Sequence, residues 1–172
     1  MFNTIKSIIR FYKSVIRKYS PLKLKDRSIE DIVNHISYND TYSSSGQPTK
    51  QQFVLIQKAG YAVVINLAPY DLIENPLRNE ATLVTKLGLR YVHIPVNMLQ
   101  PTQADFDTFA TAMQDSLGEK IWIHCAVGMR ASAFLYKYRC AVLGEDKQTA
   151  LWDLREIWEP FGVWKKFLFD AK

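Results

Sequence analysis

One short stretch of the chain combines a thiol, a glycine and a guanidinium: His124-Cys125-Ala126-Val127-Gly128-Met129-Arg130-Ala131-Ser132. An apolar run precedes it, and a segment of helical composition follows. A cysteine between a strand and a helix N-terminus is favoured as thiolate, because the helix dipole and unpaired amides attract negative charge. The loop amides can face an anion, Gly128 permits a left-handed backbone, and Arg130 can bind two oxygens of an oxyanion. The stretch therefore predicts nucleophilic attack by Cys125 on an anionic centre.

Each of these residues also has a structural interpretation. Cysteine commonly serves as a small buried apolar residue, and an arginine early in a helix commonly forms a surface ion pair. The occurrence of both residues in one short loop between a buried strand and a helix favours an active site over these structural roles. The second cysteine, Cys140, falls in the middle of a predicted helix and is assigned to the core, and His93 is expected to pack within its strand.

The surrounding elements alternate between strands and helices. We predict strands over residues 41–44, 61–67, 89–94 and 120–124, and helices over 28–35, 49–59, 75–87, 102–117, 130–143, 146–158 and 161–169. This alternation predicts an α/β fold of three layers, with a mostly parallel central sheet flanked by helices. Ligands of such sheets bind beyond the carboxyl ends of the strands, where Cys125 is placed.

The pattern His-Cys-x-x-Gly-x-Arg at residues 124–130 resembles the phosphate-binding loop of the protein-tyrosine and dual-specificity phosphatase superfamily. The wider chain resembles the bacterial phosphatase-like domain of the beta-lactamase hydrolase-like proteins. The supporting segments are residues 45–49, 63–67, 88–96, 101–102 and 158–160. The resemblance extends over about residues 40–165 and implies a cysteine-phosphatase-like fold.

The resemblance also implies roles for the loop. Cys125 is the expected nucleophile, which forms a thiophosphate intermediate. Arg130 and the amides of Ala126, Val127, Gly128 and Met129 are expected to hold the phosphoryl oxygens, and His124 to tune the thiolate through the loop backbone. Ala131 and Ser132 follow at the start of the helix, where Ser132 could reach the sulfur. Neither a metal nor another cofactor is expected, and the expected partner is a phosphorylated substrate or other oxyanion.

Three departures from the superfamily pattern bear on the reaction. Four residues separate Cys125 from Arg130 where the superfamily usually has five, and the resulting six-residue loop is the length of many rhodanese-type sulfurtransferase loops. Ala131 stands where Ser or Thr usually follows the arginine. The general-acid aspartate expected after Pro95 is missing from residues 96–99.

Two other aspartates are candidates for the general acid. Asp105 also sits three residues after Thr102, the spacing of a helix capping box, and that interpretation is favoured. Asp71 follows the predicted strand 61–67 on a facing loop. Loss of a general acid costs about 10²–10⁴-fold in rate, so a slow or specialised enzyme is expected.

Three functions fit these residues. The favoured one is cysteine-dependent hydrolysis of a phosphoester. The second is sulfur transfer through a persulfide on Cys125, which needs no general acid. The third is a catalytically weak protein that binds oxyanions. The sequence does not name the substrate or the oligomeric state.

Charge divides the chain into two parts. Residues 1–27 hold eight basic residues and one acidic, whereas the other 145 residues hold 14 basic and 16 acidic. We therefore divide the chain into a basic N-terminal helix with its linker at 1–27 and a phosphatase-like domain at 28–172. The nearly neutral domain argues against nucleic-acid binding. Two cysteines are too few for a disulfide framework, and the chain has no apolar run of about 18 residues that would form a normal transmembrane helix. We therefore expect a cytoplasmic location.

The N-terminal segment has the periodicity of an amphipathic helix. Its apolar positions are Ile5, Ile8, Ile9, Tyr12, Val15, Ile16 and Tyr19, and its basic positions are Lys6, Arg10, Lys13 and Arg17. One interpretation is a helix docked on the domain with a solvated basic face. Another is that residues 1–19 lie in the plane of an anionic inner membrane surface. Disorder or partner binding is the remaining possibility.

Overall fold

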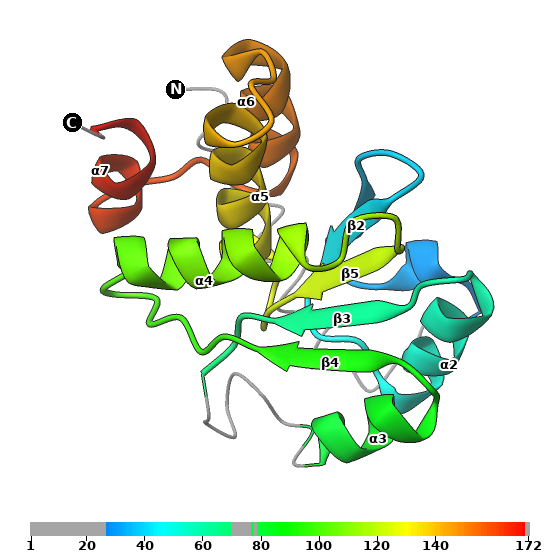
Figure 1. Cartoon of the computed structure of the whole chain (residues 1–172). Coiled ribbons are helices and arrows are strands. Elements are labelled where there is room, and N and C mark those ends of the chain that lie inside the picture. The colour runs from blue at the N-terminus through cyan, green and yellow to red at the C-terminus, as the bar shows by residue number, and fades with distance from the viewer. Residues whose placement is uncertain (1–26, 70–76, 78, 171–172) are drawn as a thin grey trace.

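A computed structural model describes residues 27–69, 77 and 79–170 of the chain (Figure 1). Five strands form one sheet in the order β1-β2-β5-β3-β4. Their bounds are β1 (Ile36–Ser37), β2 (Tyr42–Ser45), β3 (Val63–Asn66), β4 (Arg90–His93) and β5 (Ile121–His124). β1 pairs with β2 in antiparallel fashion, and all other neighbours are parallel. The predicted α/β fold with a mostly parallel sheet is confirmed.

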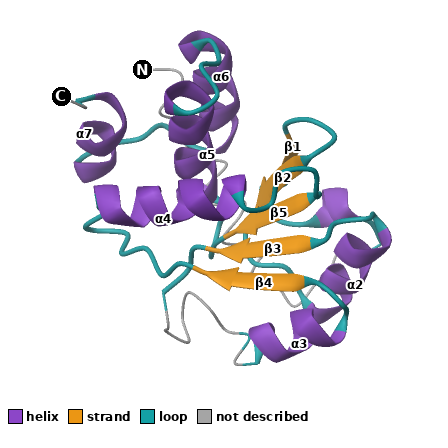
Figure 2. Ribbon diagram, in the orientation of Figure 1, coloured by secondary structure: helices purple, strands orange, loops and turns teal. Residues whose placement is uncertain are grey.

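Helices cover both faces of this sheet (Figure 2). The 3₁₀ helix η1 (Ile29–Asp31), α2 (Lys50–Lys58) and α3 (Glu80–Lys86) accompany one face. The other face carries α4 (Gln103–Gln114), α5 (Met129–Ala141), α6 (Lys147–Ile157) and α7 (Val163–Phe169). The three layers match the prediction.

Two apolar cores result from the alternation of side chains along the strands. Ile121 and Ile123 of β5 pack into the core beneath α4 to α7, whereas Trp122 between them packs into the core beneath α2 and α3. Cys125 is fully buried in the first of these cores. β5 is buried on both faces, as is typical of a parallel strand covered by helices, and it delivers the loop after it to the centre of the sheet edge.

Polar residues end four adjacent strands in one row. Ser45 of β2 is in register with His124 of β5, His124 with Asn66 of β3, and Asn66 with His93 of β4. Because the strands are parallel, this row lies at a single edge, beside the loop that follows β5. The strand ends therefore place one polar side chain each next to the candidate site.

Several predicted elements differ from the observed ones. The helix predicted over 28–35 is wrong in length: η1 ends at Asp31, Ile32 is extended, and Asn34 has a φ of 53°, which no helix accommodates. Strand β1 was not predicted; it pairs with β2 across a turn in which the Asn39 side chain accepts the amides of Thr41 and Tyr42. The helix predicted over 75–87 is described only from Glu80.

The predicted N-terminal helix lies outside the described residues, so the boundary between residues 27 and 28 stays a prediction. Within the described part of the chain, no helix has both the length and the apolar character needed to cross a membrane.

Candidate active site

The loop after β5 surrounds Cys125 with its own backbone. Gly128, which precedes α5, has a φ of 89°, a left-handed conformation that costs little only for glycine. This conformation directs the Gly128 amide to the Cys125 sulfur, with 3.1 Å between N and Sγ. The sulfur thus accepts an amide at the N-terminus of a 13-residue helix, which is a common setting for reactive cysteines. The structure therefore places Cys125 where the sequence predicted it, at the junction of strand and helix.

The segment after β2 forms one wall of this loop. Gly46 and Val127 form an isolated antiparallel bridge, and the Gln47 amide donates to the Ala126 carbonyl at 3.1 Å. Beside this segment, where the Gly46 amide donates to the Val33 carbonyl, Asn34 Nδ2 donates to the Val127 carbonyl at 2.7 Å. A Cβ on Gly46 would stand 3.1 Å from both the Ala126 oxygen and the Val127 Cα. This close approach explains why glycine occupies position 46, and the contacts hold Ala126 and Val127 in place.

Arg130 is buried in the first turn of α5, with 2% of its surface exposed. Its Nη1 donates to the Val96 carbonyl at 2.9 Å, in the segment that follows β4. That segment is held from the far side, because Trp164 Nε1 of α7 donates to the Met98 carbonyl at 2.7 Å. The guanidinium is thus fixed beside the Cys125 loop, as anion binding requires.

The two residues after Arg130 lie in the first turn of α5. Ala131 is fully buried in the core. The Ser132 hydroxyl donates to the Met129 carbonyl at 3.0 Å, within the same turn. The expected roles of both residues at the site stay predictions.

The structure gives the candidate acids unequal support. Asp105 forms the predicted capping box: its carboxylate accepts the Thr102 amide at 2.9 Å, and its own amide donates to the Thr102 hydroxyl at 3.1 Å. The capping prediction is confirmed, and a role of Asp105 as general acid stays a prediction. Asp71 lies outside the described residues. In the segment after Pro95, where the acid is expected, Asn97 is exposed and accepts the Leu99 amide through Oδ1 at 2.8 Å.

The capping box predicts the outcome of a substitution. Asp105→Asn keeps an oxygen that accepts the Thr102 amide, so turnover of an aryl phosphate is expected to stay within about twofold of the parent. The matched control is Asp107→Asn, which changes an exposed carboxylate two residues along the same helix. A fall of about 10²-fold in kcat for Asp105→Asn alone would reassign Asp105 as the general acid.

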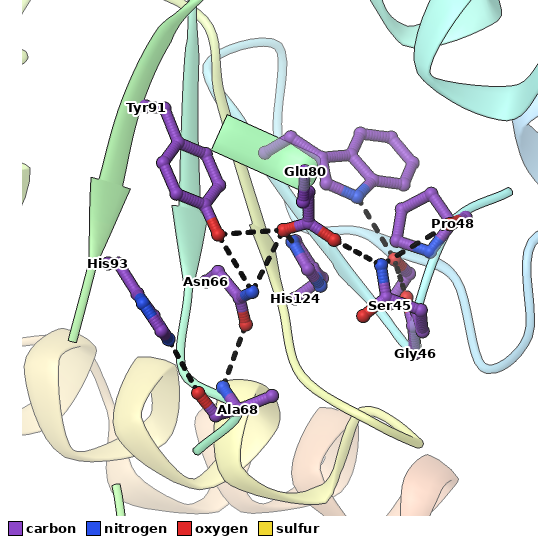
Figure 3. Close-up of polar contacts among 11 residues, drawn as sticks. Ser45, Gly46, Pro48, Asn66, Ala68, Glu80, Tyr91, His93 and His124 are labelled. Atoms are coloured by element: carbon purple, nitrogen blue, oxygen red, sulfur yellow. Dashed lines mark hydrogen bonds and ion pairs between the residues drawn. The ribbon is translucent and has the colours of Figure 1, made fainter. Parts of the chain in front are cut away.

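A buried carboxylate lies beside the loop on the α2–α3 side of the sheet (Figure 3). Glu80, the first residue of α3, is 2% exposed. Its Oε1 accepts from Asn66 Nδ2 at 2.8 Å and from the Tyr91 hydroxyl at 2.9 Å. His124 Nε2 lies 3.0 Å from the same oxygen, at an oblique angle, and Gln47 Nε2 donates to Oε2. Four segments of the chain therefore converge on Glu80.

Electrostatics keep this carboxylate ionised. Burial raises the pKa of Glu80, but the electrostatic attraction of the neighbouring His124 and the hydrogen bonds from Gln47 and Tyr91 outweigh burial, so the pKa is lowered from its usual value. The cluster joins one His to one Glu. Across the described ranges, no three His, Cys, Asp or Glu side chains are grouped as metal ligands.

Sequence reasoning missed Glu80 and Gln47 as parts of this site. Glu80 was placed inside a predicted helix, where a glutamate is ordinarily exposed. The available signal was the pattern of strands β3 and β5, whose apolar runs each end in one polar residue, Asn66 and His124. Polar side chains on a buried face need partners, and such a pattern therefore indicates a polar group opposite them.

Comparisons with known proteins identify relatives of this chain. A family model described as "DSP-PTPase phosphatase fused to NAD+ Kinase" matches residues 12–158. A beta-lactamase hydrolase-like protein of Xylella fastidiosa is 32% identical over 98 residues, which are 56% of this chain but only 22% of that protein. The chain thus corresponds to about a fifth of the curated relative.

Solved structures share the fold. A DUF442 protein from Shewanella putrefaciens CN-32, assigned as a phosphatase, has 31% identity and a TM-score of 0.72, with 83% of this chain and 93% of that chain covered. TpbA of P. aeruginosa has 21% identity, a TM-score of 0.60 and 72% coverage of each chain. The catalytic domain of SIW14 from S. cerevisiae has 14% identity and a TM-score of 0.65, with 80% and 84% covered. The last two show the fold alone. The profile match over most of the chain, together with the Shewanella relative, shows that this chain belongs to the DSP-PTPase phosphatase family described as fused to NAD+ kinase.

Proposed function

We propose that this chain hydrolyses a phosphoester through a thiophosphate intermediate on Cys125. The observation that carries the proposal is the Gly128 amide aimed at the Cys125 sulfur from the N-terminus of α5, with the buried Arg130 two residues further on. Membership of a phosphatase family supports the same chemistry. The resemblance of the loop assigns phosphoryl binding to Arg130 and to the amides of residues 126–129.

The reaction follows from these groups in two steps. The Cys125 thiolate attacks phosphorus, an S–P bond forms, and the P–O bond to the leaving group breaks. The departing oxygen takes a proton from solvent water, since no general acid is assigned. Water then attacks the thiophosphate, the S–P bond breaks, and the products are inorganic phosphate, a proton and the regenerated thiolate. Arg130 and the loop amides bear the positive charge that the transferring group needs, so the proposed reaction uses no metal.

Sulfur transfer is the second candidate, and two observations favour it. Only four residues separate Cys125 from Arg130, and Asn97 stands where the phosphatase acid is expected. In this reaction the thiolate accepts a sulfane sulfur from thiosulfate, sulfite leaves, and cyanide takes the sulfur from the persulfide to form thiocyanate. No step requires a general acid.

Two assays on the same protein separate the candidates. We expect release of phosphate from an aryl phosphate, and no thiocyanate from thiosulfate with cyanide. Thiocyanate without phosphate would replace phosphatase by sulfurtransferase. Binding of tungstate with neither product would instead assign the chain as an oxyanion-binding protein. The Cys125→Ser variant is the blank in every assay.

The substrate class is drawn from the relatives. TpbA has been solved with phosphotyrosine, and SIW14 is named as a PP-IP phosphatase and was solved with citrate. These ligands share clustered negative oxygens, and we propose a phosphorylated protein or a small phosphoester as the substrate here. The missing acid after Pro95 favours substrates whose leaving group is stable without a proton, such as aryl esters.

The second proposed partner is an anionic membrane surface, bound through residues 1–19 of a cytoplasmic protein. These residues lie outside the described part of the chain, and the proposal rests on their sequence. Each basic residue near such a surface contributes about 1 kcal/mol, and salt screens this attraction beyond a Debye length of about 8 Å. We expect the full chain to sediment with anionic vesicles at low salt and to dissociate as salt rises.

A variant of the full chain with fewer basic residues in this segment gives the control. Its four substitutions are Lys6→Gln, Arg10→Gln, Lys13→Gln and Arg17→Gln, which retain the apolar positions. The variant should stay in the supernatant while its phosphatase activity is unchanged. If the parent chain also stays in the supernatant with anionic vesicles at low salt, the membrane proposal is wrong.

A further inference from the structure

The Glu80 carboxylate is not used in the two-step reaction, yet it is buried next to the reacting loop. A buried carboxylate is costly unless its oxygens are fully hydrogen-bonded. Here both oxygens accept hydrogen bonds, from Gln47, Asn66 and Tyr91, and His124 Nε2 lies 3.0 Å from Oε1. These four partners come from four separate segments of the chain, so the carboxylate is surrounded by protein groups.

The first connection to Cys125 runs through His124, its neighbour in the chain. His124 Nε2 is 3.0 Å from Glu80 Oε1, and a carboxylate at that distance favours a proton on Nε2. Both ring nitrogens of His124 are buried, and neither makes a hydrogen bond of good geometry to the residues that the structure describes. The 3.0 Å approach of Nε2 to the carboxylate therefore favours the tautomer with its proton on Nε2, next to the negative charge. Glu80 and the edge-on ring of Phe53 together hold the imidazole in this orientation.

The second connection runs through Gln47, on the opposite side of the loop. Its side chain donates to Glu80 Oε2, while its backbone amide donates to the Ala126 carbonyl at 3.1 Å. Ala126 directly follows Cys125. The Glu80 carboxylate thus contacts His124, the residue before Cys125, directly, and it is linked through Gln47 to Ala126, the residue after Cys125.

We propose that Glu80 is a positioning residue for Cys125, because it holds His124 in one tautomer and Gln47 against the loop, and so fixes both chain neighbours of the thiol. The inference deepens the proposed function, in which Cys125 is the nucleophile. It predicts that the charge of Glu80 matters beyond the stability it contributes. The low pKa of Glu80 supports this role, since the carboxylate is ionised at neutral pH.

The test compares two variants that each weaken the same cluster. Glu80→Gln retains the shape but replaces the carboxylate with an amide, whose oxygen is a weaker acceptor for His124. Tyr91→Phe removes one donor to Oε1 and leaves both connections to the loop intact. Alkylation of Cys125 by iodoacetate is measured at a temperature well below the thermal unfolding midpoint of each variant, so that both are folded. We expect Glu80→Gln to slow alkylation and to lower kcat/KM by on the order of 10-fold to 100-fold, and Tyr91→Phe to change both by less than about threefold.

A spectroscopic readout separates positioning from stability. The chain has three histidines, so ¹⁵N signals of the imidazoles in the ¹⁵N-histidine-labelled protein can be assigned with a His124→Asn variant. In the parent protein we expect His124 to carry its proton on Nε2 with Nδ1 bare. In Glu80→Gln the signals should move toward a tautomer mixture. A purely structural Glu80 predicts an unchanged spectrum in the folded variant.

A fallback variant covers failure of Glu80→Gln to fold. In the double variant Gln47→Glu with Glu80→Gln, the amide at position 80 can donate to the carboxylate at position 47, so the hydrogen bond between the two positions is retained. The negative charge, however, no longer lies next to His124. We expect the same tautomer shift and the same slower alkylation as in Glu80→Gln. Unchanged alkylation and an unchanged His124 spectrum in either folded variant overturn the inference. The proposed function fails in a different way, when the parent protein itself releases no phosphate, and the tautomer measurement can then still be made.

Discussion

Replacing Cys125 with serine is expected to lower kcat for an aryl phosphate by about 10⁴-fold or more, the scale of loss when a covalent nucleophile is removed. The serine oxygen is smaller and far less acidic than the thiol, so it is not activated by one amide from Gly128. The anion-binding groups stay in place. Tungstate should therefore still bind to Cys125→Ser, with an affinity within about tenfold of the parent when measured by calorimetry.

The second cysteine provides the internal control. Cys140 lies within α5, and burial raises the pKa of its thiol. Iodoacetate at about pH 6 should label Cys125 much faster than Cys140, because the thiolate is the reacting form. Cys140→Ser should retain full turnover. Equal slow labelling of both cysteines, or activity that survives in Cys125→Ser, would remove Cys125 from the mechanism.

Replacing Arg130 with lysine carries the second large effect, a fall in kcat/KM of about 10²–10³-fold. The buried guanidinium donates through Nη1 to the Val96 carbonyl, which fixes its plane, and a guanidinium held in one plane can bind two oxygens of an anion at once. An ammonium is a point charge without that geometry. Weaker tungstate binding should accompany the lost turnover.

Arg155→Lys is the matched control for this substitution. Arg155 forms a two-point ion pair with Glu159 on the exposed surface of α6, so the same chemical change is made far from the loop. Its kcat/KM should stay within about twofold of the parent, since exposed ion pairs contribute little. If Arg130→Lys binds tungstate as tightly as the parent, Arg130 is not an anion ligand.

The Cys125 loop was predictable because its chemistry is local. Thiol, glycine and guanidinium lie within six residues, and the apolar run before them identifies the strand that presents them. The Thr102–Asp105 cap was predictable for the same reason, as both partners lie within one turn. Short apolar runs of strand length likewise identified the central strands β3 and β5.

The rest of the site depends on contacts distant in the chain. Asn34 reaches Val127 and Glu80 reaches His124 only after the sheet has formed. Neither position has a local pattern that differs from a surface residue. The short strand β1 was missed because two residues are too few to show a periodicity. The helix predicted over 28–35 does not form over its full length, because Asn34 has a left-handed backbone conformation.

The row of strand-end residues limits where a residue can be inserted into this chain. Ser45, His124 and Asn66 sit side by side in register, and one extra residue in a strand would turn every side chain beyond it to the opposite face. A single codon inserted in β3 or β5 would swing Asn66 or His124 away from Glu80 and break both the core and the site. The turn that precedes β5 lies at the opposite edge, where a Cβ added to Gly118 would meet no atom within 4 Å beyond its own chain neighbours. In a library of one-residue insertions selected for tungstate binding, survivors should gather at that turn and be absent from β3 and β5.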